Sequence, residues 1–266
     1  FNLDFCVLVV FSVSYMEKMF YGVDSFNQDI SDWDVSSVTI TYAMFYEAES
    51  FNQDLSDWDV SSVTDMTFMF AYTDSFNGDL SNWDVSNILN MEKMFYDAKS
   101  FNQDLSDWDV SSVTDMNWMF HGASSFNGDL SNWDVSSVTD MESMFYYATD
   151  FNQDISDWDV SSVTDMSYMF SSADSFNQDI SDWDVSSVTD MDEMFDGADD
   201  LSDEYKCAIH NSFSSNDNWE YDWEEYCPEP FQPETRNELK IAVDEWIHDS
   251  DSARVQYGEI NTWHTS

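Results

Sequence analysis

The stretch FNQDLSDWDVSSVTDM, from Phe51 to Met66, returns almost unchanged at three later places in the chain. Aligning on its phenylalanine gives eight starts, 25 residues apart (76 minus 51), at Phe1, Phe26, Phe51, Phe76, Phe101, Phe126, Phe151 and Phe176. A fixed period of this length is typical of proteins built from stacked structural repeats. We therefore expect eight 25-residue repeats over residues 1–200, the first of them degenerate because Leu8 and Val9 replace its Trp and Asp.

Each repeat carries two patterns of apolar residues. In its first half, the run Leu-Ser-Asp-Trp-Asp-Val alternates apolar and polar residues, which favours a short strand. In its second half, Val-x-x-Met-x-x-Met-Phe-x-x-Ala spaces apolar residues three and four apart, which is typical of one face of a short helix. The aspartate just before the first methionine, such as Asp65 or Asp115, is then expected to cap that helix.

A strand and a helix of this size cannot bury their apolar faces alone, whereas stacked copies bury a continuous core. We therefore expect an α/β repeat solenoid, right-handed and similar to leucine-rich repeats, with short parallel strands on one side and short helices on the other. Columns of Trp, Met and Phe would fill its core. The asparagine column from Asn27 to Asn177 would turn inward and bond backbone groups at a bend.

The repeats end at residue 200, and two further segments follow. Residues 201–234 are expected to hold a C-terminal capping helix, with Ile209 and Phe213 on its inner face, followed by an acidic loop. Residues 235–266 are expected to hold a second capping helix and the start of a further repeat.

Local signals support this reading of the C-terminal region. Thr235 and Glu238 form a capping box at the expected start of the second helix, and Ala242 and Ile247 belong to its expected inner face. Three cysteines are present, and none has a zinc-like spacing. Cys207 and Cys227 would close a loop of about 20 residues as a disulfide, with two buried thiols as the alternative.

The charge of the chain restricts its partners. It has 55 Asp and Glu residues against 7 Lys and Arg residues, and its formal net charge is −48. This argues against nucleic acids and anionic membranes as partners, because both need a basic surface. The chain is 42% hydrophobic and 17% aromatic, which predicts a folded core and not a disordered polyanion. Its apolar runs are shorter than the roughly 18 residues that span a bilayer.

If the repeats stack, the aspartates at repeat positions 4 and 9 form two columns, and these are the candidate metal ligands. Like charges about 5 Å apart repel by roughly 1 kcal/mol in water. Hydrogen bonds within each turn, screening by salt, or bridging by a hard cation would relieve this repulsion. Calcium is the expected cation, and turn-bonded or solvated aspartates are the alternative. The candidates are Asp29, Asp54, Asp79, Asp104, Asp129, Asp154 and Asp179 at position 4, and Asp34, Asp59, Asp84, Asp109, Asp134, Asp159 and Asp184 at position 9.

The recurring strings WDVSSVTDMxxMF and SFNQDLS, dense over residues 26–200, resemble the BspA-type leucine-rich repeat surface proteins, also known as the DUF285 repeat family. The tail, ELKIAVDEWI followed by YGEINTWHTS, resembles the segment that introduces the next block of repeats in long members of that family. The resemblance implies a secreted or cell-surface protein, and adhesion is the role most often linked to such proteins.

We therefore expect a non-catalytic extracellular or cell-surface protein with a structural or adhesive role, cation-bridged and forming filaments by head-to-tail stacking. Its partners would be copies of itself, or other surface proteins and glycans. The alternative is a module that recognises a protein or glycan through the variable positions 17, 18, 21, 22 and 24, for example Phe68, Trp118 and Tyr168. An enzyme is not expected, because the four histidines stand at unrelated positions and no Ser/His/Asp or Cys/His set can be assembled.

Overall fold

The computed structural model describes residues 13–228, 233, 235–250 and 253. It divides into two bodies, residues 1–221 and residues 222–266, which are described separately below. Residues 1–12 of the expected degenerate first repeat, and the expected repeat start at 257–266, lie outside the described residues. The helices are α1 (Asp203–Phe213) in the first body, and the 3-10 helix η2 (Glu224–Tyr226) and α2 (Arg236–His248) in the second.

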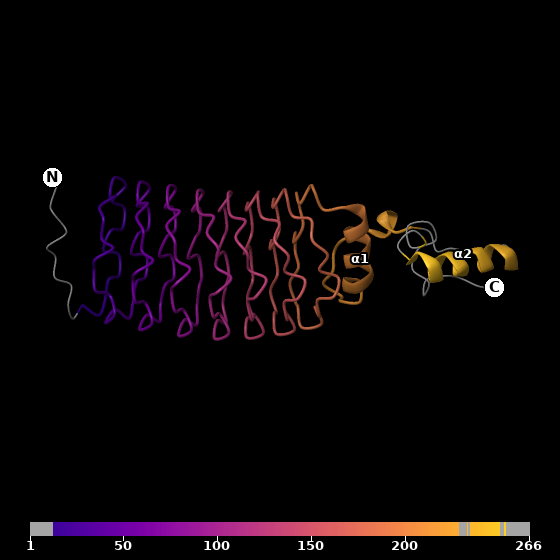
Figure 1. The fold of residues 1–266 in the computed structure, drawn as a ribbon, viewed down its shortest axis with the longest axis horizontal. Helices are drawn as coiled ribbons and strands as arrows, with labels where there is room; N and C mark the ends of the chain where they lie inside the picture. Colours follow the sequence, from indigo (N-terminus) through magenta and orange to yellow (C-terminus); the bar gives the residue numbers. More distant parts are fainter. Residues whose placement is uncertain (1–12, 229–232, 234, 251–252, 254–266) are drawn as a thin grey trace. The chain divides into compact units, whose positions relative to one another are not determined.

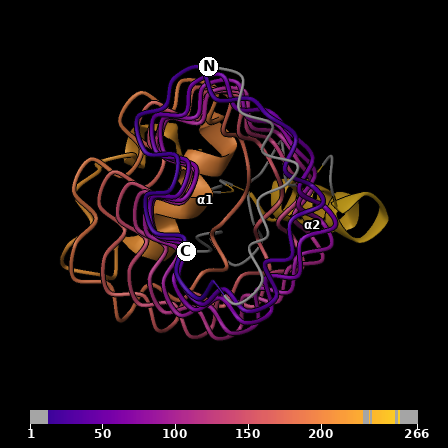
Figure 2. The same cartoon turned by 90° about the vertical axis from the view of Figure 1, so that its left-hand side faces the viewer.

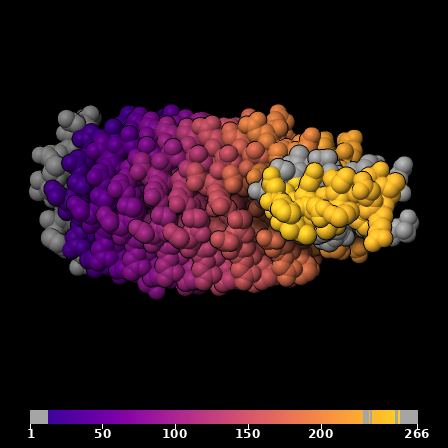
Figure 3. All heavy atoms as spheres, turned by 45° about the vertical axis from the view of Figure 1, so that its right-hand side comes forward, coloured from indigo at the N-terminus to yellow at the C-terminus, as the bar shows by residue number. Residues whose placement is uncertain are grey.

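The first body is a stack of irregular coils, one for each repeat. Figure 1 shows the coils side-on, and Figure 2 shows that the outlines of successive coils superpose when viewed along the stack. Equivalent residues of neighbouring repeats lie side by side, since the Thr139 N–H donates to the Thr114 carbonyl and a parallel bridge pairs Asp115 with Asp140. In the space-filling view, neighbouring coils are in contact along the visible face (Figure 3).

The predicted α/β solenoid of strands and helices is wrong. Among the described residues of the repeats there is no helix, and the only pairing of strand type consists of isolated bridges, so that no sheet forms. The apolar spacing that predicted a helix belongs instead to three overlapping tight turns. In one repeat, the N–H groups of Met119, His121 and Ala123 each donate to the carbonyl three residues earlier.

Helix formation is prevented because the alternate amides bond to the next coil. The N–H groups of Met116, Trp118 and Phe120 donate to carbonyls of the following repeat at 3.0, 2.8 and 2.9 Å. An α-helix would need these same amides for carbonyls four residues earlier in their own segment. In this segment of each repeat, alternate N–H groups therefore close turns within the coil, and the N–H groups between them bond to the next coil. We call this backbone the zigzag.

The backbone conformation of this zigzag repeats as well. Positions 18 and 22 have φ values between 49° and 76° throughout the described residues. Positions 18 and 22 are the third residues of the four-residue turns at positions 16–19 and 20–23. A positive φ at the third residue is characteristic of a type II turn, and an α-helix cannot continue through it. These residues are Lys18, Ala43, Phe68, Lys93, Trp118, Ser143, Tyr168 and Glu193 at position 18, and Gly22, Glu47, Tyr72, Asp97, Gly122, Tyr147, Ser172 and Gly197 at position 22.

The predicted aromatic columns form the core. Phe120 and Phe145 are fully buried, and their rings stack with centroids 5.7 Å apart. The indoles of Trp108 and Trp133 stack at 6.5 Å in a second column. The Trp108 indole N–H also donates to the Leu80 carbonyl of the preceding repeat at 2.9 Å, so the tryptophan column both fills the core and joins the coils.

The asparagine column bonds the backbone as predicted, but its side chains lie mostly at the surface. The Asn127 carboxamide oxygen accepts the N–H of Asn152 in the next repeat at 2.9 Å, and it also accepts a bond from the Gln153 side chain at 3.0 Å. The donor is a backbone N–H of the next coil, and the asparagine side chain reaches it without turning inward. It fixes the register of adjacent coils from outside.

Helix α1 forms as predicted and packs at the end of the stack. Its N-cap Ser202 accepts the Tyr205 N–H, and Ile209 and Phe213 are buried. Trp219, which follows α1, makes edge contacts with Phe213 at 5.4 Å and with Phe195 of the last coil at 6.1 Å. The last coil is therefore covered within the first body.

In the second body, the predicted capping box is present at the start of α2. Thr235 accepts the Glu238 N–H, and the Glu238 side chain accepts the Thr235 N–H. Of the residues expected to face inward, Ala242 is buried but Ile247 is 71% exposed, so that part of the prediction is wrong. No helix among the described residues is long and apolar enough to cross a membrane.

The two cysteines of the C-terminal region are both disulfide-bonded. Cys207 lies buried in α1, and Cys227 directly follows η2. Their pairing with each other stays a prediction.

The indole hydrogen bonds can be tested by comparing two tryptophans. Trp108→Phe removes the indole bond to the Leu80 carbonyl, which keeps the Trp83 N–H as its other donor, whereas Trp33→Phe removes a buried indole N–H that has no partner among the described residues. We expect Trp108→Phe to lower the free energy of unfolding by about 1 kcal/mol more than Trp33→Phe. Urea denaturation of both variants measures this difference, and equal losses would show that the indole bonds do not join the coils.

Candidate binding face

The two predicted aspartate columns lie at the surface, and each carboxylate is bonded within its own turn. The Asp109 Oδ1 accepts the N–H and the hydroxyl of Ser111 at 3.1 and 2.6 Å. The Asp154 Oδ1 accepts the same two groups of Ser156 at 3.0 and 2.7 Å. The N–H bond from the serine two residues on recurs at all the candidate ligands: Asp29, Asp54, Asp79, Asp104, Asp129, Asp154, Asp179, Asp34, Asp59, Asp84, Asp109, Asp134, Asp159 and Asp184.

At Asp109, Asp154 and Asp159 these local hydrogen bonds outweigh the causes that oppose them. The pKa of Asp159 is lowered, first by the Ser161 hydroxyl and then by the Ser161 N–H, while the charge of Asp184 is the smallest opposing cause. Asp109 and Asp154 have lowered pKa values for the same first cause, the hydroxyl of the serine two residues on. The hydrogen bonds within their own turns therefore stabilise the charged form of these three carboxylates.

The stacking of the columns does not bring enough side-chain ligands together, among the described residues, to form a metal site. Over the described part of the chain, no group of three or more His, Cys, Asp or Glu side chains is placed to hold a metal ion. The sequence placed the aspartates in columns, but it did not show that the Oδ1 of each carboxylate already accepts the N–H of the serine two residues on. Calcium binding by these columns, predicted from the sequence, is not tested by this geometry, and the hydrogen bonds favour the alternative of turn-bonded aspartates.

A melting experiment separates calcium binding from screening of the columns. We expect the Tm to rise equally with calcium chloride and with sodium chloride at matched ionic strength, because the carboxylates are already bonded and salt only screens their repulsion. Scanning calorimetry in both salts, with chelator as the reference, measures the shifts. An additional rise in calcium would establish a bound ion that stabilises the fold.

The pKa of Asp109 can be tested directly. Its folded pKa lies below the ordinary value of 3.8, so its contribution to stability is present above that pH and is lost as the pH falls through the folded pKa. We expect Ser111→Ala, which removes the hydroxyl donor, to raise the pKa of Asp109 toward 3.8. NMR titration of the carboxyl carbon measures it, with Ser112→Ala as the control. A pKa that moves equally in both variants, or in neither, would contradict this role.

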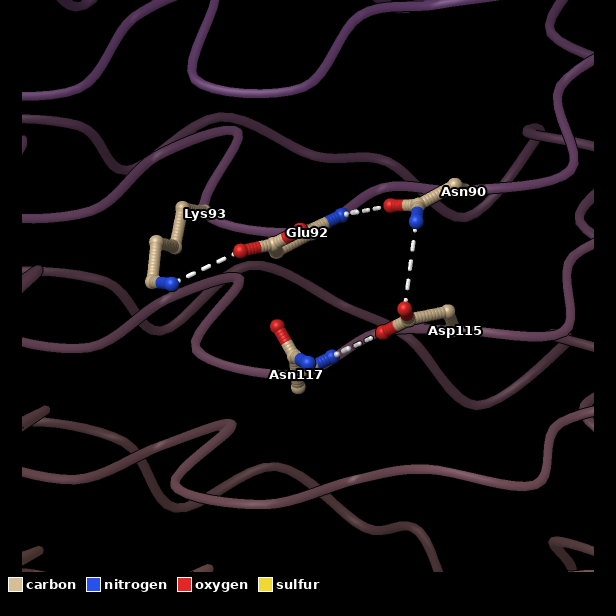
Figure 4. A network of polar contacts seen from close by, with 5 residues as sticks. All are labelled: Asn90, Glu92, Lys93, Asp115 and Asn117. Atoms are coloured by element: carbon tan, nitrogen blue, oxygen red, sulfur yellow. Dashed lines mark hydrogen bonds and ion pairs between the residues drawn. The ribbon is translucent and has the colours of Figure 1, made fainter.

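The aspartates at position 15 cap tight turns and not the expected helices. The Asp115 Oδ1 accepts the Asn117 N–H at 3.0 Å. In the preceding repeat Asn90 takes this position, accepting the Glu92 N–H at 2.7 Å and donating to the Asp115 Oδ2 at 3.1 Å (Figure 4). Burial raises the pKa of Asp115, which the Asn117 bond opposes. The neutral Asn90 thus replaces a charge repulsion with a hydrogen bond where the column is half-buried.

The residues that differ between repeats gather at positions 17, 18, 21 and 22, and we call this strip the variable face. Many of them are aromatic, and their rings are in contact from one coil to the next. The His121 ring stacks on Tyr96 at 4.4 Å and meets Tyr146 edge-on at 4.8 Å, and Tyr146 contacts Tyr147 at 4.4 Å. The aromatic residues of the face are Tyr21, Tyr42, Tyr46, Phe68, Tyr72, Tyr96, Trp118, His121, Tyr146, Tyr147 and Tyr168.

A lysine of the chain lies among these rings. The Lys93 ammonium is 5.1 Å from the centre of the Phe68 ring and 5.5 Å from that of Trp118. Its nitrogen also lies 2.7 Å from an oxygen of Glu92 (Figure 4). Phe68, Lys93 and Trp118 stand at position 18 of three successive repeats. The variable face therefore already holds one cation between two aromatic rings and beside a carboxylate.

Three buried polar atoms on this face have no hydrogen-bond partner among the described residues. They are the Asn117 Oδ1, the His121 Nδ1 and the Ser143 Oγ, in two adjacent repeats. Burial, with the charge of Lys93 as the second cause, lowers the pKa of His121 to about 4, so its ring is neutral at pH 7. Such unsatisfied groups are uncommon in folded proteins. Sequence reasoning noted the variable positions but did not detect this cluster, because His121 and Ser143 belong to different repeats.

Comparison with known proteins concerns mainly the repeats. A family described as "Mycoplasma protein of unknown function, DUF285" matches residues 2–108 and 94–208. The chain belongs to the DUF285 family. The matched residues of this DUF285 protein include the variable face and reach into α1. No curated protein and no solved structure matches the chain.

Proposed function

We propose that this DUF285 protein is a non-catalytic, extracellular or cell-surface scaffold with an adhesive role, which recognises a protein or glycan through the variable face. The observation that carries the proposal is a contrast within each repeat. The core columns and the turn-bonded aspartates recur from coil to coil, whereas the differences gather on one strip of aromatic and acidic side chains. The resemblance to BspA-type surface proteins supports the location and the adhesive role.

The conformation of the variable face also supports a binding role. Trp118, Tyr147 and Tyr168 have φ values of 58°, 57° and 57°, a region that costs an ordinary residue about 1–2 kcal/mol and costs glycine little. Glycine does occupy position 22 in three repeats, for example at Gly122. Large aromatic residues therefore stand where glycine fits better, which is expected where the ring itself is needed.

The aromatic rings are also accessible to a partner. Tyr147 is 49% exposed, and Tyr96, Trp118 and Tyr168 are half-buried. Rigid aromatic side chains give large contact areas at low conformational cost and are frequent anchors of binding surfaces. Head-to-tail stacking has less support, because α1 and Trp219 pack at the last coil of the first body.

The proposal is tested by removing rings without straining the backbone. The double variant Trp118→Gly with Tyr147→Gly places glycine at two positive φ values, so we expect the fold to be retained. Beads coated with the protein would be tested for adhesion to cell layers and to arrays of extracellular proteins and glycans. We expect adhesion to fall by about tenfold or more.

The matched control changes two exposed residues outside the variable face, Asp107→Ser with Asp157→Ser. These aspartates stand at position 7 of their repeats. Equal adhesion by the two double variants, or adhesion by neither the variants nor the parent protein, would contradict the proposed function.

A further inference from the structure

The arrangement around Lys93 recurs two repeats further along the stack, without its lysine. At position 18, Phe68, Lys93 and Trp118 are followed by Ser143 and Tyr168. Ser143 therefore stands between Trp118 and Tyr168 as Lys93 stands between Phe68 and Trp118. The same pattern holds for the carboxylate, since position 17 is Glu92 beside Lys93 and Glu142 beside Ser143.

The place equivalent to the Lys93 ammonium holds no cation of the chain. Within the described residues, the cation–π contacts involve only Lys18 and Lys93, and neither lies over Tyr168. Ser143 is 1% exposed, and its Oγ is buried without a hydrogen-bond partner. Trp118, Tyr168, Glu142 and Ser143 thus stand at the repeat positions that Phe68, Trp118, Glu92 and Lys93 occupy around the Lys93 ammonium, and that ammonium has no counterpart there among the described residues.

The charges around this place favour a cation. Burial raises the pKa of Glu142, a hydrogen bond with the Trp118 side chain lowers it, the charges of Asp165 and Asp140 raise it further, and the charge of Lys93 opposes them. The net shift is upward, so the carboxylate is only partly compensated by Trp118 and Lys93. The pKa of Tyr168 is raised, first by the charge of Glu193, then by burial and by nearby carboxylates that include Asp192. An aromatic face in a field of carboxylates attracts an ammonium or guanidinium group more strongly than a neutral ligand.

We propose that Trp118, Glu142, Ser143 and Tyr168 form a site for a lysine or arginine side chain of a basic polypeptide partner. This inference rests on the proposed function and names the class of partner that the variable face takes. A basic polypeptide also suits the formal net charge of −48, which steers cationic partners toward the protein at long range. A neutral glycan would use the rings but not Glu142, and the acetylated peptide serves as the test for such a neutral ligand.

The decisive variant is Ser143→Lys, which rebuilds the Lys93 arrangement inside the chain and fills the site. Lysine tolerates this backbone, because Lys18 and Lys93 have φ values of 55° at the same repeat position. The control is Ser137→Lys, at an exposed position of the same repeat, which changes the net charge equally. Tyr168→Gly is an independent second variant, since glycine fits the φ of 57° and the change removes one ring.

The probe is a synthetic lysine-rich peptide, with the same peptide acetylated on every lysine as its neutral counterpart. Binding is measured by calorimetry at physiological ionic strength, and Tm values confirm that each variant is folded. We expect the parent protein to bind the charged peptide and not the acetylated one. Ser143→Lys and Tyr168→Gly should each weaken binding by about threefold or more, and Ser137→Lys by clearly less.

Three outcomes would overturn the inference. Equal weakening by Ser143→Lys and Ser137→Lys would mean that the peptide responds only to net charge. Equal binding of the acetylated peptide would mean that the face takes a neutral ligand. If the peptide does not bind at all while adhesion still depends on Trp118 and Tyr147, the basic partner is wrong and the proposed function stands.

Discussion

The structure depends on how each repeat divides its amide groups. Between positions 16 and 22, alternate N–H groups bond to the next coil, and those between them close tight turns within the same coil. This division satisfies the backbone without a helix or a sheet, which buried backbone groups require. It also brings the side chains of each position into register from coil to coil. The aromatic core, the aspartate columns and the variable face all follow from that register.

The sequence was sufficient to predict the columns but not the backbone that carries them. The 25-residue period, the tryptophan and phenylalanine core, α1 and the capping box of α2 all follow from spacing and capping chemistry. The repeat helix failed because apolar spacing of three and four fits overlapping turns as well as it fits a helix. The positive φ at positions 18 and 22 decides between them, and residues such as Phe68 and Trp118 give no sign of it.

The candidate sites show the same limit. The aspartate columns were visible in the sequence, but their serine partners two residues on make them turn caps with lowered pKa values at Asp109 and Asp159. The cation site required a comparison across repeats, because Trp118, Ser143 and Tyr168 are distant in sequence and adjacent only in the stack. Residues that form no recognisable motif within one repeat can therefore form a site together with residues of the neighbouring coils.

The conformation at position 18 has a consequence for how such a protein changes over time. The same left-handed backbone carries Lys93, Trp118, Ser143 and Glu193, so one basic, one aromatic, one small polar and one acidic side chain occupy a common scaffold. The coil is held by its amides and its core, and neither involves these side chains. A single codon change can therefore alter what one place on the surface recognises while the architecture beneath is inherited intact. The surface at position 18 can therefore change in one repeat without changing the backbone of that repeat or of its neighbours.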